Sequence, residues 1–168
     1  MTVSDPKRIE KIVQQLRTFL REISVMSLAT VDDQAQAHAC NAYFVADDDL
    51  NIFFVSDVDS AHATHIRRRP QMAVTVHAPV HRWQDIHGVQ IHGNCRSVEP
   101  DQWDTVWSIF IAKFPETEEL KDYARASQFY QITPTWIRWT DNRGHFGYKV
   151  ELNWPPDKAT KAVPQGTV

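Results

Sequence analysis

Cysteine, excess charge and long apolar runs are what this chain lacks. Cys40 and Cys95 are its only cysteines, too few for a disulfide framework and typical of a reduced, intracellular protein. A net charge of −3 offers no basic surface for nucleic acid or an acidic membrane. No stretch could span a bilayer, and none near the N-terminus resembles a signal peptide. We therefore expect a cytoplasmic protein that binds neither nucleic acid nor membrane.

The rest of the composition is that of a globular domain. A chain of 168 residues, 42% of them apolar, is long enough for one domain with a full core. Six tryptophans favour flat hydrophobic surfaces or a protein interface. Neither an internal repeat nor a low-complexity block divides the chain.

Hydrophobic periodicity and turn residues divide the chain into helices and strands. Apolar stripes at helical spacing predict helices over 5–22, 61–69, 100–114 and 117–126, the first capped by Ser4. Alternating and β-branched segments predict strands over 24–31, 37–46, 51–56, 71–78, 86–98, 129–140 and 146–152. Short polar connections, among them Asp141–Gly144, favour antiparallel hairpins. The pattern predicts a mainly β, α+β fold, a small antiparallel barrel with helices packed outside it.

Two glycines fall inside one of the predicted strands. Gly88 and Gly93 lie within 86–98, where glycine marks a bulge or the close approach of a ligand or another backbone. After residue 153 the chain is rich in proline, lysine and threonine, which predicts an extended or loosely ordered tail over 154–168.

The segment 51–70 is the best candidate for a phosphate site. An apolar strand runs directly into a helix, and the first backbone N–H groups of a helix favour an anion. Asp59 or Ser60 can cap that helix, and Pro70 ends it. The arginine triplet at its C-terminal end suits the helix dipole, and Arg67 is the member best placed to reach a phosphate.

Several motifs follow one another in a familiar order. They are Met26–Thr30, Phe54–Asp57, Asp59–His62, Ile66–Pro70, Gly88–Gly93 and Trp139–Lys149. In this order they resemble the pyridoxamine 5'-phosphate oxidase-like family of split β-barrel flavoproteins, over about Ser24 to Leu152. The resemblance implies a Greek-key split β-barrel that forms a homodimer and holds FMN at the subunit interface. Residues 1–153 would then be a single FMN-binding domain with its N-terminal helix within 1–23.

The resemblance also assigns residues to the cofactor. Asn41 would face the flavin ring or its ribityl chain, and Gln90 would lie on the ring-facing strand. Ser56 and His62 would contact the phosphate. Trp139 and Lys149 would reach the flavin from the partner chain.

Departures from the family pattern limit what can be assigned. Ala61 stands where relatives have Arg or Lys, which removes a charge-assisted hydrogen bond worth about 1.5–3 kcal/mol. The substrate-binding residues of the true oxidases are not recognisable, and no side chain demands a role as general acid or base. The resemblance thus implies an FMN-dependent oxidoreductase of unknown substrate and unknown catalytic residues.

Two other functions stay open. One is a non-catalytic module that holds flavin or haem, and the other is a dimeric scaffold that has lost its cofactor. We predict no metal site, although the chain has eight histidines. His62 and His65 can share a helix face, His87 and His92 point to opposite faces of a strand, and no cysteine joins either pair at zinc-ligand spacing.

Overall fold

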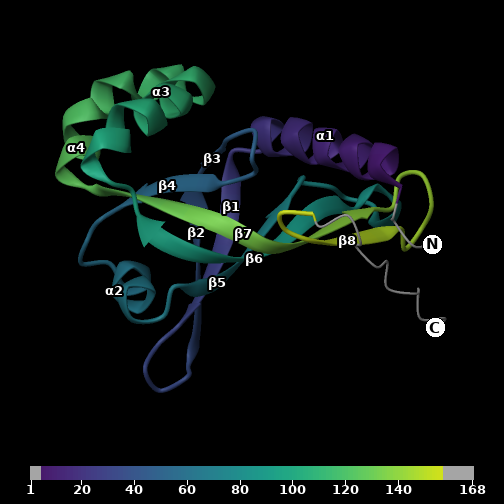
Figure 1. Cartoon of the computed structure of the whole chain (residues 1–168), viewed down its shortest axis with the longest axis horizontal. Helices are drawn as coiled ribbons and strands as arrows, with labels where there is room; N and C mark the ends of the chain where they lie inside the picture. Colours follow the sequence, from purple (N-terminus) through teal and green to yellow (C-terminus); the bar gives the residue numbers. More distant parts are fainter. Residues whose placement is uncertain (1–4, 157–168) are drawn as a thin grey trace.

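Helix α1 (Pro6–Glu22) follows the apolar stripe in its sequence. In this computed structural model, which describes residues 5–156, Asp5 caps the helix by accepting a hydrogen bond from the Lys7 amide at 3.1 Å. The predicted cap, Ser4, lies outside the described residues. Leu16 and Leu20 are among the side chains that α1 buries against the sheet. Figure 1 shows α1 lying over the sheet, well separated from α2 (Ala61–Arg68).

Eight strands form one antiparallel sheet. They are β1 (Val25–Val31), β2 (Ala37–Tyr43), β3 (Val45–Ala46), β4 (Ile52–Ser56), β5 (Gln71–His77), β6 (His87–Ser97), β7 (Gln128–Asp141) and β8 (Lys149–Asn153). Their order across the sheet is β2-β1-β5-β6-β7-β4-β3, and β8 pairs with the C-terminal half of β7. The strand predicted over 37–46 is therefore two strands, because Phe44 interrupts it.

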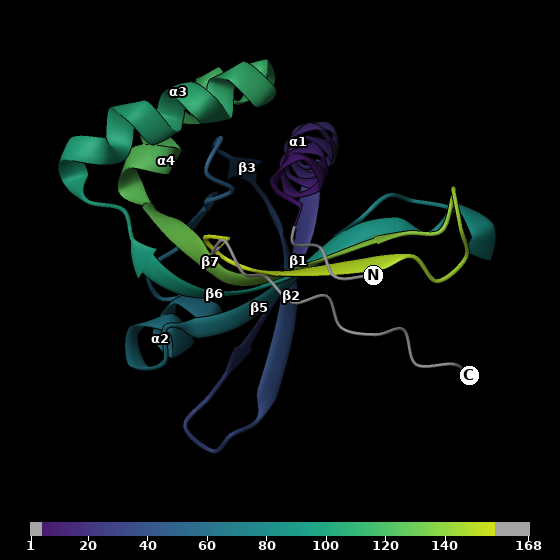
Figure 2. The same cartoon turned by 45° about the vertical axis from the view of Figure 1, so that its right-hand side comes forward.

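Phe44 closes the barrel. β2 and β3 are the two ends of the sheet order, yet this single residue separates them along the chain. The sheet must therefore curl so that its two end strands come together at Phe44, and Figures 1 and 2 show the curled sheet. Phe44 is fully buried, and its amide donates to the Ser24 carbonyl at 3.3 Å. The predicted antiparallel split β-barrel with flanking helices is confirmed.

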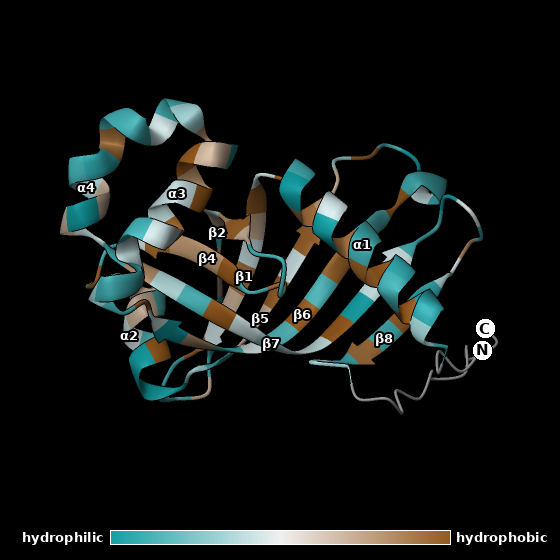
Figure 3. Ribbon diagram, turned by 45° about the horizontal axis from the view of Figure 1, so that its top comes forward, coloured by the Kyte–Doolittle hydropathy of each residue, from teal (hydrophilic) through white to brown (hydrophobic). Residues whose placement is uncertain are grey.

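Helices cover two different faces of the curled sheet. The remaining ones are α3 (Trp103–Lys113) and α4 (Lys121–Ala126), with 3₁₀ turns at Trp83–Asp85, Pro100–Gln102 and Pro115–Leu120. α1 and α2 contribute to the core inside the barrel, whereas α3 and α4 form a second core outside β4. On β4, Phe54 points into the first core and Phe53 into the second. Figure 3 shows the hydrophobic residues of α1 turned toward the sheet.

Both glycines of β6 lie where another backbone comes close, as predicted. The register between β6 and β7 shifts between His92 and Gly93, which is a β-bulge. A Cβ atom on Gly93 would lie 2.6 Å from the Thr133 carbonyl oxygen, and one on Gly88 would lie 2.6 Å from that of Val76. Any larger residue would push the neighbouring strands apart.

The connection between β7 and β8 is longer than the predicted Asp141–Gly144 turn. β8 begins at Lys149 rather than at residue 146. Asn142 Oδ1 accepts a hydrogen bond from the Gly147 amide at 3.0 Å, and Gly147 has a φ of 78° that favours glycine. After β8, the Trp154 indole donates to a carbonyl of the β3–β4 turn at 3.1 Å. The predicted tail beyond residue 156 lies outside the described residues.

One half-buried lysine ties three parts of the fold together. Lys113, the last residue of α3, donates from Nζ to the carbonyls of Leu20 at 2.8 Å, Ile23 at 2.7 Å and Phe44 at 3.0 Å. The ammonium also lies 4.1 Å from the centre of the Phe44 ring, a cation–π contact. Burial lowers the pKa of Lys113 to about 8. The end of α1, the end of α3 and the barrel junction are therefore joined at one group.

We expect Lys113→Met to destabilise the protein. The substitution keeps most of the aliphatic stem but removes every donor from these carbonyls, and a buried acceptor left without its partner costs about 1–3 kcal/mol. Urea unfolding at pH 7 measures the difference from wild type. The matched control is Lys121→Met, which changes an exposed lysine of α4 and should stay within about 0.5 kcal/mol.

The same pair of proteins gives a pH test. Because burial lowers the pKa of Lys113 from its ordinary 10.5 to about 8, the unfolded chain holds this proton more tightly than the folded chain between these values. The unfolding free energy of wild type relative to Lys113→Met should therefore rise with pH across this window and stay flat just below it. A difference that does not change across the window would contradict the assignment.

Candidate functional site

A polar row on the outer face of the sheet contains two of the predicted cofactor contacts. The pairing register places Asn41, Ser27, Thr75 and Gln90 side by side across β2, β1, β5 and β6. Ser27 Oγ donates to Asn41 Oδ1 at 2.7 Å, and Arg138 Nη1 donates to Gln90 Oε1 at 3.2 Å. A hollow of about 430 Å³ lies beside the row, lined by Ser27, Asn41 and Thr75 among others. The outer face therefore presents aligned amide and hydroxyl groups next to an open volume.

The neighbouring row on this face begins with three alanines and ends with two aromatic rings. Ala39, Ala29 and Ala73 lie directly opposite one another on β2, β1 and β5. His92 and Trp136 continue the row, with their rings stacked at 4.5 Å. Within residues 5–156, the helices pack on the barrel interior or outside β4 and leave these rows uncovered. Another sheet or a planar ring can approach this surface closely.

Hydroxyl and imidazole groups converge at the start of α2. Ser60 caps the helix, as predicted, and its Oγ accepts from the Ala63 amide at 3.3 Å. His62 Nε2 lies 2.7 Å from Ser56 Oγ and 3.2 Å from Ser60 Oγ. Its Nδ1 lies 3.5 Å from Cys40 Sγ. Ser56 and His62 therefore meet beside the first amides of the helix, an arrangement that favours an anion.

His62 is a poor base in this position. Burial, and after it the electrostatic interaction with nearby His65, lowers the pKa of His62 below its usual 6.5. His65 occupies the same helix face, as predicted, with Nδ1 2.9 Å from Thr30 Oγ1 and its ring 4.7 Å from that of His38. At neutral pH His62 therefore offers hydrogen bonds and no charge.

The polar row and the α2 cluster lie on opposite sides of β2. Cys40, which contacts His62, and Asn41, which belongs to the row, are consecutive residues of a strand and point to opposite faces. β2 is an end of the sheet order, so within residues 5–156 the backbone groups along its outer edge have no strand partner. A ligand that reaches both groups must cross this edge.

The arginines of α2 are engaged with the fold. Arg67 donates from Nη1 to the Val58 carbonyl at 2.6 Å and from Nη2 to Thr64 Oγ1 at 3.0 Å. Arg68 forms an ion pair with Asp33 in the β1–β2 turn. These contacts hold two surface connections and fix the position of the Arg67 guanidinium.

The comparison with known proteins agrees with this architecture. Residues 12–141 match the family model described as pyridoxamine 5'-phosphate oxidase. The chain belongs to this family. A UPF0306 protein from Klebsiella pneumoniae is 30% identical over 118 residues, which cover 70% of this chain and 76% of the relative.

Two solved structures share the fold. The haem storage protein HutZ from Vibrio cholerae has 19% identity and a TM-score of 0.62, over 72% of this chain and 88% of its own. A haem-binding protein from Mycobacterium smegmatis has 15% identity and a TM-score of 0.70, over 84% of this chain and 57% of its own. At these identities the likeness concerns the split barrel alone.

The two tryptophans of β7 in this family member face opposite ways. Trp139, the predicted flavin contact, is 2% exposed and lies on the inner face, 5.1 Å from the Phe19 ring. Trp136 lies on the outer face, where sequence reasoning did not select it. Their odd spacing along one strand was the available signal. Lys149, the other predicted partner contact, is exposed at the start of β8 and pairs with Thr140.

Two further expectations concern metals and membranes. Within residues 5–156, no three His, Cys, Asp or Glu side chains are grouped so that they could hold a metal ion. His87 and His92 lie on opposite faces of β6, as expected, one against Phe19 and the other against Trp136. No helix in the described part of the chain is long and apolar enough to cross a membrane.

We expect the pKa of His62 to depend on its neighbour. His65→Gln removes the electrostatic interaction with His65 and leaves the burial in place, so the pKa of His62 should rise toward its usual value without reaching it. Ring-proton NMR titrations of both proteins measure this. His81→Gln, in an exposed loop, is the control and should leave the titration of His62 unchanged. A wild-type value at or above 6.5 would show that the ring is not desolvated.

Proposed function

We propose that this chain binds FMN and acts in the cytoplasm as a flavin-dependent oxidoreductase whose substrate is unknown. The observation that carries the proposal is the convergence of Ser56, Ser60 and His62 at the start of α2, beside the free edge of β2. Membership in the pyridoxamine 5'-phosphate oxidase family supports the cofactor class. The free thiols of Cys40 and Cys95 support a reducing compartment.

The α2 cluster is the proposed phosphate seat. Both serine hydroxyls and the His62 ring can donate to phosphate oxygens, and the amides at the start of the helix add two or three more donors, as is typical of helix N-termini. Because Ala61 carries no charge and His62 is neutral, the seat binds through hydrogen bonds and the helix dipole. We therefore expect weaker FMN binding than a seat with an added arginine or lysine would give.

The flavin ring is proposed to lie on the outer face. The ribityl chain of an FMN whose phosphate lies at the α2 cluster would cross the edge of β2 and reach Asn41. Gln90 lies farther along the same row. A second copy of the chain would cover the ring and supply Lys149 from its β8. Trp136 faces this surface, whereas Trp139 is buried on the other side of the sheet. The contact between Trp139 and a flavin stays a prediction.

The residues of this chain would bind and orient the cofactor. FMN supplies the redox chemistry when it is bound. Asn41 and Gln90 carry amide groups that can hydrogen-bond the polar edge of a flavin, and the alanine row leaves room for its flat face. No residue of the outer face is placed as a proton donor or acceptor in a reaction, so we assign no catalytic residue.

The proposal predicts a yellow protein that releases FMN on denaturation. His62→Ala should weaken FMN binding roughly tenfold or more, because it removes a hydrogen bond to a charged phosphate worth about 1.5–3 kcal/mol. Fluorescence titration of the apoprotein with FMN measures the affinity, and thermal unfolding checks that the variant is folded. His81→Ala should bind as wild type does. A colourless protein that takes up no added FMN would refute the proposal, and reduction of bound FMN by NADH or NADPH distinguishes an enzyme from a holder.

The homodimer has its own test. Ala29 lies in the middle of the alanine row, between Ala39 and Ala73. Ala29→Arg places a charge at the centre of the proposed interface and should convert a dimer into a monomer in light scattering, with loss of FMN affinity. Glu116→Arg changes an exposed residue in the turn before α4. This variant is the control and should leave the dimer intact. A wild-type monomer would exclude a shared interface site.

Haem is a second candidate for the same surface. The solved relatives named for haem share this fold, and His92 lies on the outer face with its ring stacked on Trp136. An imidazole in such a position can serve as an axial ligand. Uptake of haemin with a Soret shift that is lost in His92→Ala, in place of FMN uptake, would favour this function.

A further inference from the structure

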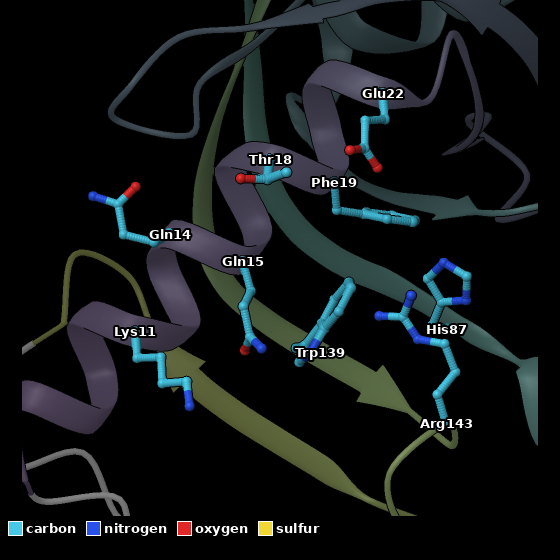
Figure 4. A pocket seen from close by; sticks show the side chains of 9 residues that line it. All are labelled: Lys11, Gln14, Gln15, Thr18, Phe19, Glu22, His87, Trp139 and Arg143. Carbon is cyan, nitrogen blue, oxygen red and sulfur yellow. The ribbon is translucent and has the colours of Figure 1, made fainter.

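A second hollow lies under α1, on the side of the sheet opposite the proposed flavin surface. It has a volume of about 420 Å³. Lys11, Gln15, Phe19 and Glu22 of α1 form one wall. His87 of β6, Trp139 of β7 and Arg143 of the β7–β8 connection form the other. Figure 4 shows Gln15 and Phe19 of α1 on the side of the helix where the Trp139 indole lies, with His87 and Arg143 beyond the indole, whereas Gln14 points away.

Trp139 brings an unsatisfied donor to this hollow. The side chain is 2% exposed, and its Nε1 is the one buried side-chain nitrogen or oxygen of residues 5–156 without a hydrogen-bond partner. Buried indole N–H groups usually find an acceptor, and leaving one without it costs about 1–3 kcal/mol. An acceptor that enters the hollow and reaches Nε1 recovers this cost.

The hollow has an aromatic wall. The Phe19 ring lies edge-to-face between His87 at 5.5 Å and Trp139 at 5.1 Å. Such a wall favours a flat ring, since aromatic pairs gain energy beyond the area that they bury.

The rim carries charges of both signs, and only its Lys11 end favours an anion. Lys11 forms no ion pair within the described residues, so its charge is available. Arg143 already donates from Nε and Nη2 to both Asp141 carboxylate oxygens at 2.8 Å. Glu22 at the far end disfavours a second negative charge. The ligand that matches this balance carries one carboxylate.

We propose that the hollow under α1 binds a small aromatic monocarboxylate. Its ring lies against Phe19 and Trp139, and its carboxylate accepts the hydrogen of Trp139 Nε1 near the Lys11 ammonium. Nε1 is shielded from solvent, so a side chain at the mouth of the hollow has to move when the ligand enters, and the proposal assigns this movement to exposed Gln15, which lines the same hollow. This site is independent of the flavin proposal, because Trp139 and Gln90 point to opposite faces of adjacent strands.

The test is titration of the full chain with benzoate and with nicotinate, followed through the indole N–H signals in a ¹H–¹⁵N NMR spectrum. The Trp139 signal is the one missing from Trp139→Phe. We expect it to shift downfield and to saturate with either carboxylate, whereas benzamide at equal concentration leaves it nearly unchanged. Trp139→Phe keeps an aromatic ring but removes the N–H group. It should weaken benzoate binding roughly tenfold, because one charge-assisted hydrogen bond is lost.

Variants of α1 refine the test. Lys11→Met should weaken benzoate binding up to about fivefold and reduce its salt dependence, as loss of an exposed charge does. Gln15→Ala removes the side chain over the indole and should leave benzoate binding equal or tighter. The controls are Lys121→Met, on α4, and Trp107→Phe, a buried tryptophan of the second core. Neither should change the affinity.

Three results would overturn the proposal. The first is that neither carboxylate moves any indole N–H signal of the wild-type protein, a result that needs no assignment and holds even if Trp139→Phe does not fold. The second is a Trp139 signal that moves in Gln15→Ala without ligand while benzoate does not bind, because the Gln15 amide is then the acceptor. The third is equal affinity for benzamide and benzoate, because the hollow then does not select an anion.

Discussion

The join at Phe44 sets the geometry of the whole chain. One residue connects the two ends of an eight-stranded sheet, so the sheet has to curl into a barrel and cannot stay open. The Lys113 ammonium holds this join through the Phe44 carbonyl and fixes the end of α1 at the same point. Because the chain leaves β2 through this join, β2 stays an unpaired edge with one face turned inward and the other outward. The candidate site depends on that edge.

The site is therefore divided, and its chemistry differs on the two sides. Behind β2, the start of α2 collects hydroxyls, a neutral imidazole and backbone amides, all of which donate hydrogen bonds without carrying charge. In front of β2, Asn41 and Gln90 lie on a flat face beside alanines. The nearby arginines of α2 are committed to other acceptors. A ligand with an anionic end and a planar polar end fits this division, which is the reason that we propose FMN and not a simple phosphate ester.

The sequence predicted those features of the fold that depend on residues close together in the chain. The apolar stripe of α1, the Ser60 cap and the two strand glycines depend on neighbours a few residues away, and the structure has each of them. The break at Phe44 and the role of Lys113 depend on partners distant in sequence, which a single chain read in order does not display. The strand predicted over 37–46 failed for this reason, because apolar residues continue through the break while the pairing partner changes from β1 to β4. The alternation of Trp136 and Trp139 was readable, but the family resemblance directed attention to the second ring.

Helix α1 makes contacts both with the junction at Phe44 and with the hollow beside Trp139. Lys113 holds the Leu20 carbonyl near the C-terminal end of α1, and Phe19 of α1 packs against Trp139 of β7. Anything that adds contacts beneath α1 in the folded state stabilises that state by mass action, and the end of the helix is fixed to the join that shapes β2. An indole donor left unsatisfied under this helix therefore matters beyond its own hydrogen bond. Its cost falls on the packing between α1 and β7, and the proposed ligand would offset that cost by supplying an acceptor.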